Sequence, residues 1–453
     1  MDVRNKHIVI MGLGKSGAAA ARFLCRQQAR VTVTDRADEK ALAPYPDQLR
    51  ELEIRFALGG HPAEVFDGAD LIVLSPGVPH TLDCLNRCRE RGVPVIGEVE
   101  LAARFIRQPI VAVTGTNGKT TTTTLVGEML EASGKTVFVG GNIGSPLIGY
   151  VAAEQPADIV VAEISSFQLD TVETFRPSVA ALLNIAEDHL DRYPDFEGYV
   201  RSKARIFENQ KAGDRAVVNG ADPVIRSMVK GIESRPLFFN TCDENEYGAI
   251  VRDESLIVRL SDRDSYCLDL SCARHLGRHN LENVAAASLA ALAAGADPEG
   301  IEIALKRFRG LPHRLEFVAD VDGVRYMDDS KATNTAAVIK ALASMTRPVV
   351  LIMGGRGKET DFSKLEGMIG SRVKHLILMG ETRTEIRRAL GHTVPTENAD
   401  SMADAVQKAR RQTVSGDVVL LSPACASFDM FDSYAHRGRM FRRAVEELTC
   451  KSA

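Results

Sequence analysis

Short apolar runs alternate with longer stretches of helical character along the whole chain. These runs occupy residues 71–74, 109–113, 158–162, 179–183, 349–353, 376–379 and 418–421. Each is apolar almost throughout, which is typical of strands buried on both faces of a parallel sheet. Helices are expected between them, as at residues 98–105, 197–207 and the Ala-rich 284–296. The pattern predicts an α/β protein built from open parallel sheets.

The chain divides into three segments of this kind. At 453 residues it is too long for one ordinary hydrophobic core. We predict a Rossmann-like domain at residues 1–97, a central P-loop ATPase-type domain with a parallel sheet at 98–310, and a second Rossmann-like domain at 311–453. Residues 310–314, Gly-Leu-Pro-His-Arg, are typical of a linker before the last domain.

Composition narrows the class of protein. A net charge of −4 argues against a general nucleic-acid or membrane-surface binder. The eight cysteines include one close pair, Cys84 and Cys88, without further partners at a spacing that suits zinc, so we expect reduced thiols in a cytoplasmic protein. We expect neither a secretion signal nor a membrane span, which needs about 20 apolar residues. The basic cluster at residues 437–443 is predicted to be a solvated helix face.

The first segment carries a glycine motif between two strands. Gly12, Gly14 and Gly17 lie between an apolar strand and an Ala-rich helix. Asp35 ends the next strand. In a Rossmann unit such glycines permit a tight turn, the approach of a phosphate and the packing of helix on strand, and the acidic residue holds a ribose or base. Residues 75–78, Ser-Pro-Gly-Val, form a loop at another strand's carboxyl end. These features predict a nucleotide site and, by themselves, favour NAD.

The second segment carries a phosphate loop. Residues 115–121, Gly-Thr-Asn-Gly-Lys-Thr-Thr, follow an apolar strand and lead into a helix. Backbone N–H groups there can converge on an anion, Lys119 would reach the terminal phosphates, and the Thr120 hydroxyl would hold Mg²⁺. The standard motif has Gly where Val113 stands, so the match is partial. Glu163 ends a neighbouring strand and is a natural Mg²⁺ ligand. Together they predict the use of a nucleoside triphosphate.

The third segment has polar loops at three junctions between strand and helix. They are residues 328–334, Asp-Asp-Ser-Lys-Ala-Thr-Asn, residues 354–358, Gly-Gly-Arg-Gly-Lys, and residues 422–429, Ser-Pro-Ala-Cys-Ala-Ser-Phe-Asp. Three such loops in one domain indicate a binding site more than they indicate simple turns.

Taken in order, these motifs resemble the Mur ligases. TGTNGKTTT (residues 114–122) and DSKATN (329–334) are shared widely in that family, whereas GNIG (141–144), EISSFQL (163–169) and LSPACASFDMF (421–431) resemble its D-glutamate-adding branch. The resemblance covers all three segments. It implies an ATP-dependent ligase that phosphorylates the carboxylate of UDP-N-acetylmuramoyl-L-alanine and joins it to the amine of D-glutamate, in cytoplasmic peptidoglycan precursor synthesis. It also suggests a monomer.

The resemblance further implies an ATP and magnesium site. Thr120 and Glu163 would hold one Mg²⁺, and His189 would help to hold a second. Lys203 matches a lysine that the family carries as a carbamate, although the sequence alone predicts an ordinary exposed lysine. The residues expected to contact ATP are Gly115, Thr116, Asn117, Gly118, Lys119, Thr120, Thr121, Asn280, Asn283, Arg314 and Asp329.

The two other substrates are assigned in the same way. The pocket for D-glutamate would comprise Lys331, Thr333, Lys358, Ser427, Phe428 and Tyr434. Lysines and hydroxyls suit a dicarboxylate because it needs hydrogen-bond donors at both ends. The residues expected to contact the uridine nucleotide or its sugar and peptide end are Gly14, Ser16, Asp35, Arg36, Asn142 and His189. The glycine motif would therefore hold UDP in place of NAD.

Three alternatives remain. Another Mur-type ligase, or a folylpolyglutamate-type ligase, would share the middle domain and differ at both ends. A GTP-binding switch protein would share the phosphate loop, but the nearest guanine-reading segment, Asn-Gly-Ala-Asp at residues 219–222, lacks the lysine. An NAD-dependent dehydrogenase would explain only the first 35 residues. If the chain is a D-glutamate-adding ligase, ATP and D-glutamate bind to different domains. This interpretation therefore predicts domain closure about hinges near residues 310–314.

Overall fold

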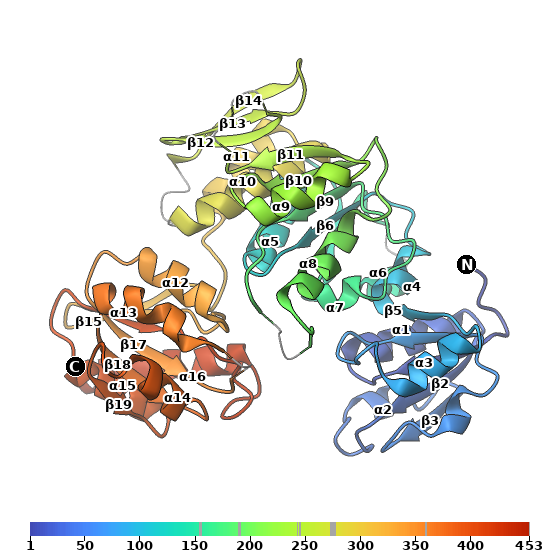
Figure 1. Cartoon of the computed structure of the whole chain (residues 1–453), viewed down its shortest axis with the longest axis horizontal. Helices are drawn as coiled ribbons and strands as arrows, with labels where there is room; N and C mark the ends of the chain where they lie inside the picture. The colour runs from blue at the N-terminus through green and yellow to red at the C-terminus, as the bar shows by residue number, and fades with distance from the viewer. Residues whose placement is uncertain are drawn as a thin grey trace. The chain divides into compact units, whose positions relative to one another are not determined.

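The computed structural model describes residues 1–153, 156–188, 192–241, 243, 246–271, 278–357 and 360–452. It has three open, mostly parallel sheets in three successive α/β domains, coloured blue, cyan to yellow, and orange to red in Figure 1. This confirms the predicted fold class. The chain forms two compact units. Residues 1–185, 197–273 and 282–308 make the first, and residues 186–196, 274–281 and 309–453 make the second.

The first sheet is five-stranded and parallel. Its elements are β1 (His7–Met11), α1 (Lys15–Arg26), β2 (Arg30–Asp35), α2 (Tyr45–Gln48), β3 (Ile54–Leu58), the 3₁₀ turn η1 (Ala63–Phe66), β4 (Leu71–Leu74), α3 (Asp83–Glu90) and β5 (Val95–Gly97). The strand order is β3-β2-β1-β4-β5. Ile8 and Ile10 pack with α1, and Val9 and Met11 join the core on the opposite face. The order reverses between β1 and β4, where such sheets bind ligands at their carboxyl ends.

The middle sheet has nine strands in the order β14-β13-β12-β11-β10-β9-β6-β8-β7. Its strands are β6 (Ile110–Thr114), β7 (Val137–Gly141), β8 (Ile159–Glu163), β9 (Val179–Leu182), β10 (Arg215–Asn219), β11 (Arg235–Phe239), β12 (Gly248–Arg252), β13 (Ser255–Arg259) and β14 (Ser265–Asp269). Strands β6 to β12 are parallel, whereas β12, β13 and β14 form an antiparallel meander outside the predicted parallel pattern. The phosphate loop follows β6, whose neighbours are β8 and β9.

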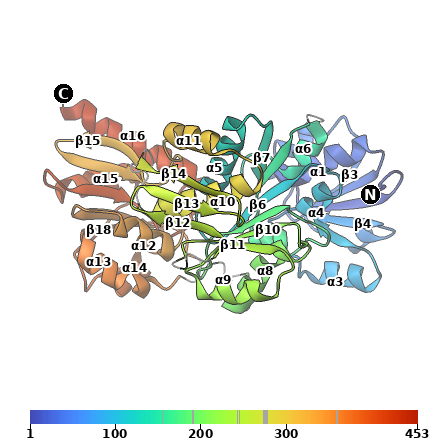
Figure 2. The same ribbon diagram turned by 90° about the horizontal axis from the view of Figure 1, so that it is seen from above.

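Helices cover both faces of the middle sheet. They are α4 (Glu98–Ala103), α5 (Lys119–Ala132), α6 (Leu147–Ala153), α7 (Ser166–Leu169), α8 (Phe196–Ala204), η2 (Arg205–Phe207), α9 (Pro223–Met228), η3 (Val229–Gly231), α10 (Arg278–Ala293) and α11 (Pro298–Arg307). Figure 2 shows α5 and α11 on one side of the sheet and α9 on the other. One apolar cluster continues from the first sheet through α1, α4 and α6 to the middle sheet. The first two domains therefore share a core.

The third sheet has six strands in the order β15-β16-β20-β17-β18-β19. Its elements are β15 (Glu316–Val321), β16 (Val324–Asp328), α12 (Thr335–Ala343), β17 (Val349–Gly354), η5 (Phe362–Leu365), α13 (Glu366–Arg372), β18 (Val373–Met379), α14 (Arg383–Leu390), β19 (Thr396–Asn398), α15 (Met402–Arg411), β20 (Val418–Leu421) and α16 (Tyr434–Ser452). Val349 and Leu351 pack with α12 to α14, and Val350 and Ile352 with α15 and α16. This two-sided burial explains the continuous apolar runs. Only β15 is antiparallel to its neighbour.

The expectation for the basic cluster of α16 is wrong in part. The basic residues at 437–443 do not form a uniformly solvated face, because Arg437 is only 1% exposed. Arg439 and Arg443 are exposed, as predicted. The charge pattern is that of a surface helix, but the first turns of α16 lie beneath the loops of the third domain. Among the described residues, no helix is both long and apolar enough to span a membrane.

Candidate functional site

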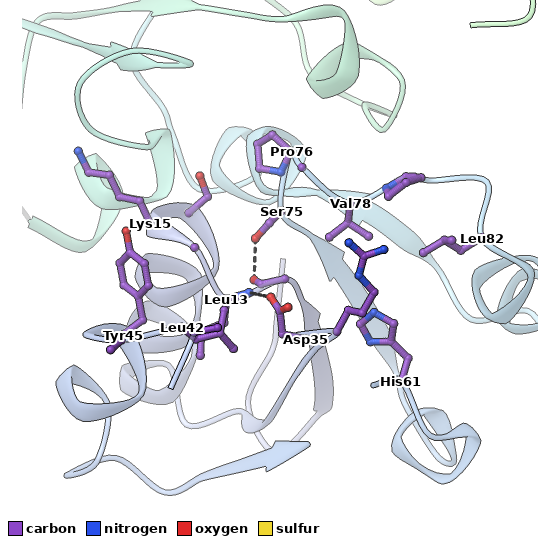
Figure 3. Close-up of a pocket in the computed structure, with 18 residues that line it drawn as sticks. Leu13, Lys15, Asp35, Leu42, Tyr45, His61, Ser75, Pro76, Val78 and Leu82 are labelled. Atoms are coloured by element: carbon purple, nitrogen blue, oxygen red, sulfur yellow. Dashed lines mark hydrogen bonds between the residues drawn. The ribbon is translucent and has the colours of Figure 1, made fainter. Parts of the chain in front are cut away.

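A cavity of about 790 Å³ opens at the carboxyl ends of β1, β2 and β4 (Figure 3). Its lining includes Gly14, Ser16, Asp35 and Arg36, four of the six residues predicted to contact the uridine nucleotide or its sugar and peptide end. The predicted loop at residues 75–78 also lines it. Sequence reasoning missed several further lining residues. Lys15 stands within the glycine motif but was not assigned a role, and the others come from segments without a motif: Leu42, Tyr45, His61 and Leu82.

The glycine motif is shaped as its spacing predicts. Gly12 has a φ of +96°, which a residue with a side chain rarely adopts. A Cβ on Gly17 would lie 2.0 Å from the Gly12 carbonyl oxygen, so only glycine lets the helix pack this closely. A Cβ on Gly14 would meet no atom within 4 Å, so this position faces open space. Asp35 holds the turn from β2, since its Oδ2 accepts the N–H of Leu13 at 2.7 Å.

The phosphate loop is held from the end of β9. The N–H of Asn117 donates to Oδ1 of Asn184 at 2.9 Å, and Nδ2 of Asn184 donates back to the Asn117 carbonyl at 3.0 Å. Gly118 has a φ of +86° and precedes the first turn of α5, which contains Thr120 and the buried Thr121. The loop therefore has a fixed conformation at the start of a helix, as an anion site requires.

Two lysines converge on the same carbonyl of this loop. Nζ of Lys119 donates to Gly115 O at 2.8 Å, and Nζ of Lys203 donates to the same oxygen at 3.0 Å. Lys203 is 1% exposed and lies over the ring of Tyr199, whose hydroxyl is 3.2 Å from Oγ1 of Thr116. The sequence alone predicts an exposed lysine here, and that prediction is wrong because α8 packs against the phosphate loop.

Glu163 lies beside the phosphate loop with half of its carboxylate unused. It ends β8, in register with Val113 of β6 and Gly141 of β7. Its Oε1 accepts a hydrogen bond from Nδ2 of Asn142 at 2.7 Å. The residue is 2% exposed, yet Oε2 has no partner among the described residues. A buried carboxylate oxygen without a donor is costly unless a cation or water serves it.

Asn283 lies against the loop from the other direction. A Cβ on Gly118 would lie 2.3 Å from Oδ1 of Asn283, which places that amide beside the first turn of α5. Asn280 lies in the same helix, α10, three residues earlier. His189 and Lys358, which the resemblance assigns to the site, lie outside the described residues.

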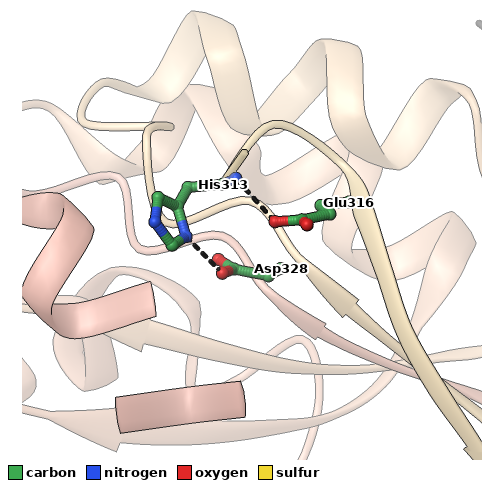
Figure 4. Close-up of side chains that lie close together, drawn as sticks. All are labelled: His313, Glu316 and Asp328. Carbon is green, nitrogen blue, oxygen red and sulfur yellow. Dashed lines mark hydrogen bonds and ion pairs between the residues drawn. The ribbon is translucent and has the colours of Figure 1, made fainter. Parts of the chain in front are cut away.

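In the second unit, the end of β16 forms a buried polar cluster (Figure 4). Nδ1 of His313 is 2.7 Å from Oδ2 of Asp328, and the N–H of His313 donates to Oε2 of Glu316 at 3.0 Å. His313 and Leu315 both have positive φ, +63° and +47°, so a strained turn flanks Arg314. The cluster therefore fixes the backbone on both sides of that arginine.

Asp329 follows in the same loop and is buried. Its Oδ2 accepts the hydroxyl of Ser422 at 2.8 Å, and its Oδ1 accepts the N–H of Leu315 at 3.3 Å. Burial raises the pKa of Asp329 to about 7, although the Ser422 bond and the nearby Arg314 guanidinium oppose the rise. This carboxyl connects the linker turn with the loops after β16 and β20.

The predicted amino-acid pocket is partly assembled in this unit. Nζ of Lys331 lies 3.8 Å from the ring centroid of Tyr434, so these two predicted residues are adjacent. Ser427 is 2% exposed, whereas Phe428 is 65% exposed. Thr333 is half-buried in the same loop as Lys331.

Arg437 is a residue of this site that the sequence motifs did not reveal. Its guanidinium donates to Ser330 Oγ at 2.9 Å, Ser330 O at 2.8 Å, Cys425 O at 3.1 Å and Ala426 O at 3.3 Å. A Cβ on Gly355 would be 3.2 Å from Nη1, so the loop at residues 354–358 lies against Arg437 as well. Burial lowers the pKa of Arg437 to about 10, which leaves it charged at neutral pH. One buried cation thus holds three predicted site loops together.

Comparison with known proteins identifies the family. Residues 6–97, 113–291 and 313–425 match family models described as Mur ligase MurD-like N-terminal domain, Mur ligase middle domain, and Mur ligase glutamate ligase domain. A UDP-N-acetylmuramoylalanine--D-glutamate ligase of Desulfosudis oleivorans is 52% identical over 448 residues, which covers 99% of this chain and 98% of the relative. The chain belongs to the Mur ligase family. A protein of the same name from Desulfatibacillum aliphaticivorans is 50% identical and covers 99% of this Mur ligase and 100% of the relative.

The fold of this Mur ligase is also found in solved structures. The MurF ligase of Thermotoga maritima in complex with ADP superposes with a TM-score of 0.63 and 18% identity, over the whole of both chains. At that identity the likeness supports the three-domain fold alone.

Proposed function

We propose that this Mur ligase joins D-glutamate to UDP-N-acetylmuramoyl-L-alanine with consumption of ATP. One observation carries the proposal: a buried carboxylate with an unused oxygen, Glu163, lies beside a phosphate loop in a chain that matches D-glutamate ligases over its full length. The alternatives explain less. A dehydrogenase would leave the phosphate loop without a role, and a GTP-binding switch would leave the first and third domains without one.

The chemistry proceeds in two steps. A carboxylate oxygen of the L-alanyl end attacks the γ-phosphorus of ATP, so that ADP leaves and an acyl phosphate forms. The amine of D-glutamate then attacks the acyl carbon, phosphate departs with the C–O bond electrons, and the amine loses a proton as the amide forms. Every reactant is an anion, so the barrier depends on concentrated positive charge and on alignment. Lys119 and the N–H groups at the start of α5 stabilise the phosphates of ATP, while Arg314 stabilises the γ-phosphoryl group.

The residues present fit bound Mg²⁺. Oxygen ligands suit this ion, and Glu163 Oε2 together with the Thr120 hydroxyl would hold it at the phosphate loop. When bound, Mg²⁺ neutralises charge on the phosphates. His189 and Lys203 are proposed for a second ion. Lys203 as a carbamate would present an anion from a buried position, next to Gly115, where an ammonium otherwise sits beside Lys119.

The remaining assignments follow the resemblance to the Mur ligases. The 790 Å³ cavity would hold the uridine nucleotide through Gly14, Ser16, Asp35 and Arg36, and Asn142 would lie toward the sugar and peptide end. Asn280, Asn283 and Asp329 would contact the adenosine part of ATP. D-glutamate would bind to Lys331, Thr333, Lys358, Ser427, Phe428 and Tyr434. We further propose domain boundaries at 97/98 and 310/311, and activity as a monomer in the cytoplasm, where ATP and UDP-sugars are available.

The test is phosphate release from ATP and Mg²⁺ in the presence of UDP-N-acetylmuramoyl-L-alanine. D-Glutamate is compared with L-glutamate, D-alanine, L-lysine and diaminopimelate, with bicarbonate present. Release with D-glutamate alone, together with the amide product by mass spectrometry, is the expected result. Release with another amine would retain the ligase chemistry and overturn the substrate. An absence of release with every amine would refute the proposed function.

A further inference from the structure

Glu98 is a buried acid at the junction of the first two domains. It is the first residue of α4 and is 2% exposed. Its Oε1 accepts the N–H of Ile148 at 2.7 Å, and the N–H of Leu147 also bonds to the carboxylate. Its Oε2 has no partner among the described residues. Since buried polar atoms are nearly always paired, this oxygen calls for an explanation.

Glu100, the next acid on the same helix, is a carboxylate with a purely structural role. Glu100 is 0% exposed and accepts hydrogen bonds from the N–H groups of Glu173, Thr174 and Phe175, from the Thr174 hydroxyl and from Arg104. Both of its oxygens are fully used. Glu98 lies one residue beyond β5 in the same shared core and keeps one oxygen unused, so packing alone does not account for it.

Glu98 lines a second, small cavity of about 10 Å³. This volume is close to the smallest that holds one water molecule. Ser75, Pro76 and Gln168 also line it. Ser75 and Pro76 belong at the same time to the wall of the 790 Å³ cavity, as Figure 3 shows. Glu98 is therefore separated from the proposed nucleotide cavity by a single loop.

The other oxygen of Glu98, Oε1, is connected through the start of α6 to the proposed metal site. Ile148, whose N–H donates to it, lies in the first turn of α6, directly after the turn at residues 141–146. In that turn, Asn142 donates from Nδ2 to Oε1 of Glu163 at 2.7 Å, and its N–H donates to the Glu163 carbonyl at 2.8 Å. Holding the start of α6 therefore holds Asn142, and Asn142 sets the direction of the Glu163 carboxylate.

We propose that Glu98, with one water molecule bound between its Oε2 and the 75–76 loop, is a positioning residue that aligns Asn142 and Glu163 with the phosphate loop. The proposal rests on the proposed function for its kinetic effects. Glu98 touches no reacting atom. It acts through α6, and the water extends its contact to the wall of the nucleotide cavity, so loss of the side chain should disturb the response to Mg²⁺ more than it disturbs folding.

The kinetic test uses E98A and E98Q in the full chain, with E100Q as the matched control. Phosphate release is titrated with Mg²⁺ at a temperature where circular dichroism shows each variant folded. For E98A we expect the Mg²⁺ concentration at half-maximal rate to rise about ten-fold, as for the loss of other groups that orient a metal ligand. E98Q keeps an acceptor for the N–H groups and a polar atom toward the cavity, so it should restore most of the wild-type response. E100Q should melt earlier with an unchanged response to Mg²⁺. Equal Mg²⁺ responses of E98A and E100Q would overturn the proposal.

Two further measurements do not require turnover. A crystal structure at high resolution should show one ordered water within hydrogen-bond distance of Glu98 Oε2, and an empty cavity would overturn the proposal. Calorimetric titration with a non-hydrolysable ATP analogue should show a weaker Mg²⁺ dependence of binding in E98A than in E98Q. If wild-type protein releases no phosphate with any amine, the proposed function fails, and these two measurements still decide the role of Glu98.

Discussion

The sharpest prediction concerns the pH dependence of stability at Glu98. Burial raises the pKa of Glu98 from 4.5 to about 7, because the backbone N–H groups of Ile148 and Leu147 compensate only part of the lost hydration. The folded-state pKa lies above the unfolded one. The contribution of Glu98 to the free energy of unfolding is therefore fully present below about pH 4.5, and it is lost as pH rises toward 7. At 1.36 kcal/mol per pKa unit, the full loss is about 3 kcal/mol.

The substitution Glu98→Gln removes this titration and leaves a neutral group of the same shape. Between about pH 5.5 and about pH 8, wild-type protein should lose about 2 kcal/mol of unfolding free energy relative to E98Q. The assay is urea unfolding followed by far-UV circular dichroism, because the chain contains no tryptophan to report by fluorescence. Since a chain of several domains need not unfold in one step, each transition is compared between variants.

Glu100→Gln provides the control on the same helix. Hydrogen bonds from Glu173, Thr174 and Arg104 outweigh the effect of burial and lower the pKa of Glu100. Glu100 is therefore ionised in both the folded and the unfolded state across that pH range. E100Q should be less stable than wild type by an amount that does not change between about pH 5.5 and about pH 8. Parallel pH profiles for E98Q and wild type would refute the reasoning about Glu98.

Three further predictions concern the proposed site. Arg437→Lys should lose at least two of four buried charge-assisted hydrogen bonds, or about 3 kcal/mol, and should raise the KM for D-glutamate, whereas the exposed Arg439→Lys should change neither. Equal urea midpoints for Arg437→Lys and Arg439→Lys would count against a role of Arg437 in holding the loops together. Glu163→Gln should lower kcat by roughly 100-fold with little change in melting temperature, and unaltered kcat would remove Glu163 from the metal site. Lys203→Arg retains a cation but cannot form a carbamate, so it should abolish any stimulation of wild-type phosphate release by bicarbonate. Persistent stimulation in that variant would exclude Lys203 as the carbamylated group.

The parallel part of the fold follows from the sequence because burial on both faces leaves a local mark. Val349 to Met353 is apolar at every position, and its alternate side chains enter the two cores of the third domain. The antiparallel strands have a weaker pattern in the sequence. Strands β12 to β14 lie at one end of the middle sheet with many half-buried or exposed side chains, so their pattern does not stand out.

Motifs that depend on backbone conformation were also readable from the sequence. Gly12 and Gly118 have positive φ, and Gly17 allows a helix to approach a carbonyl, so the residue type itself carries the information. The register of β8 beside β6 then brings Glu163 to the phosphate loop, as the position of each motif at a strand end suggested.

The sequence by itself determined the fold class and the two glycine-dependent turns, because these are properties of consecutive residues. That the polar loops form a site stays a prediction. Only the tertiary structure decided that Lys203 and Arg437 are buried and that Glu98 keeps an unused oxygen beside a water-sized cavity. A lysine or arginine on a helix has the same local pattern whether its face meets solvent or another loop. Burial of a charge is set by segments far away in the chain, and its free energy depends on the donors and acceptors that those segments provide.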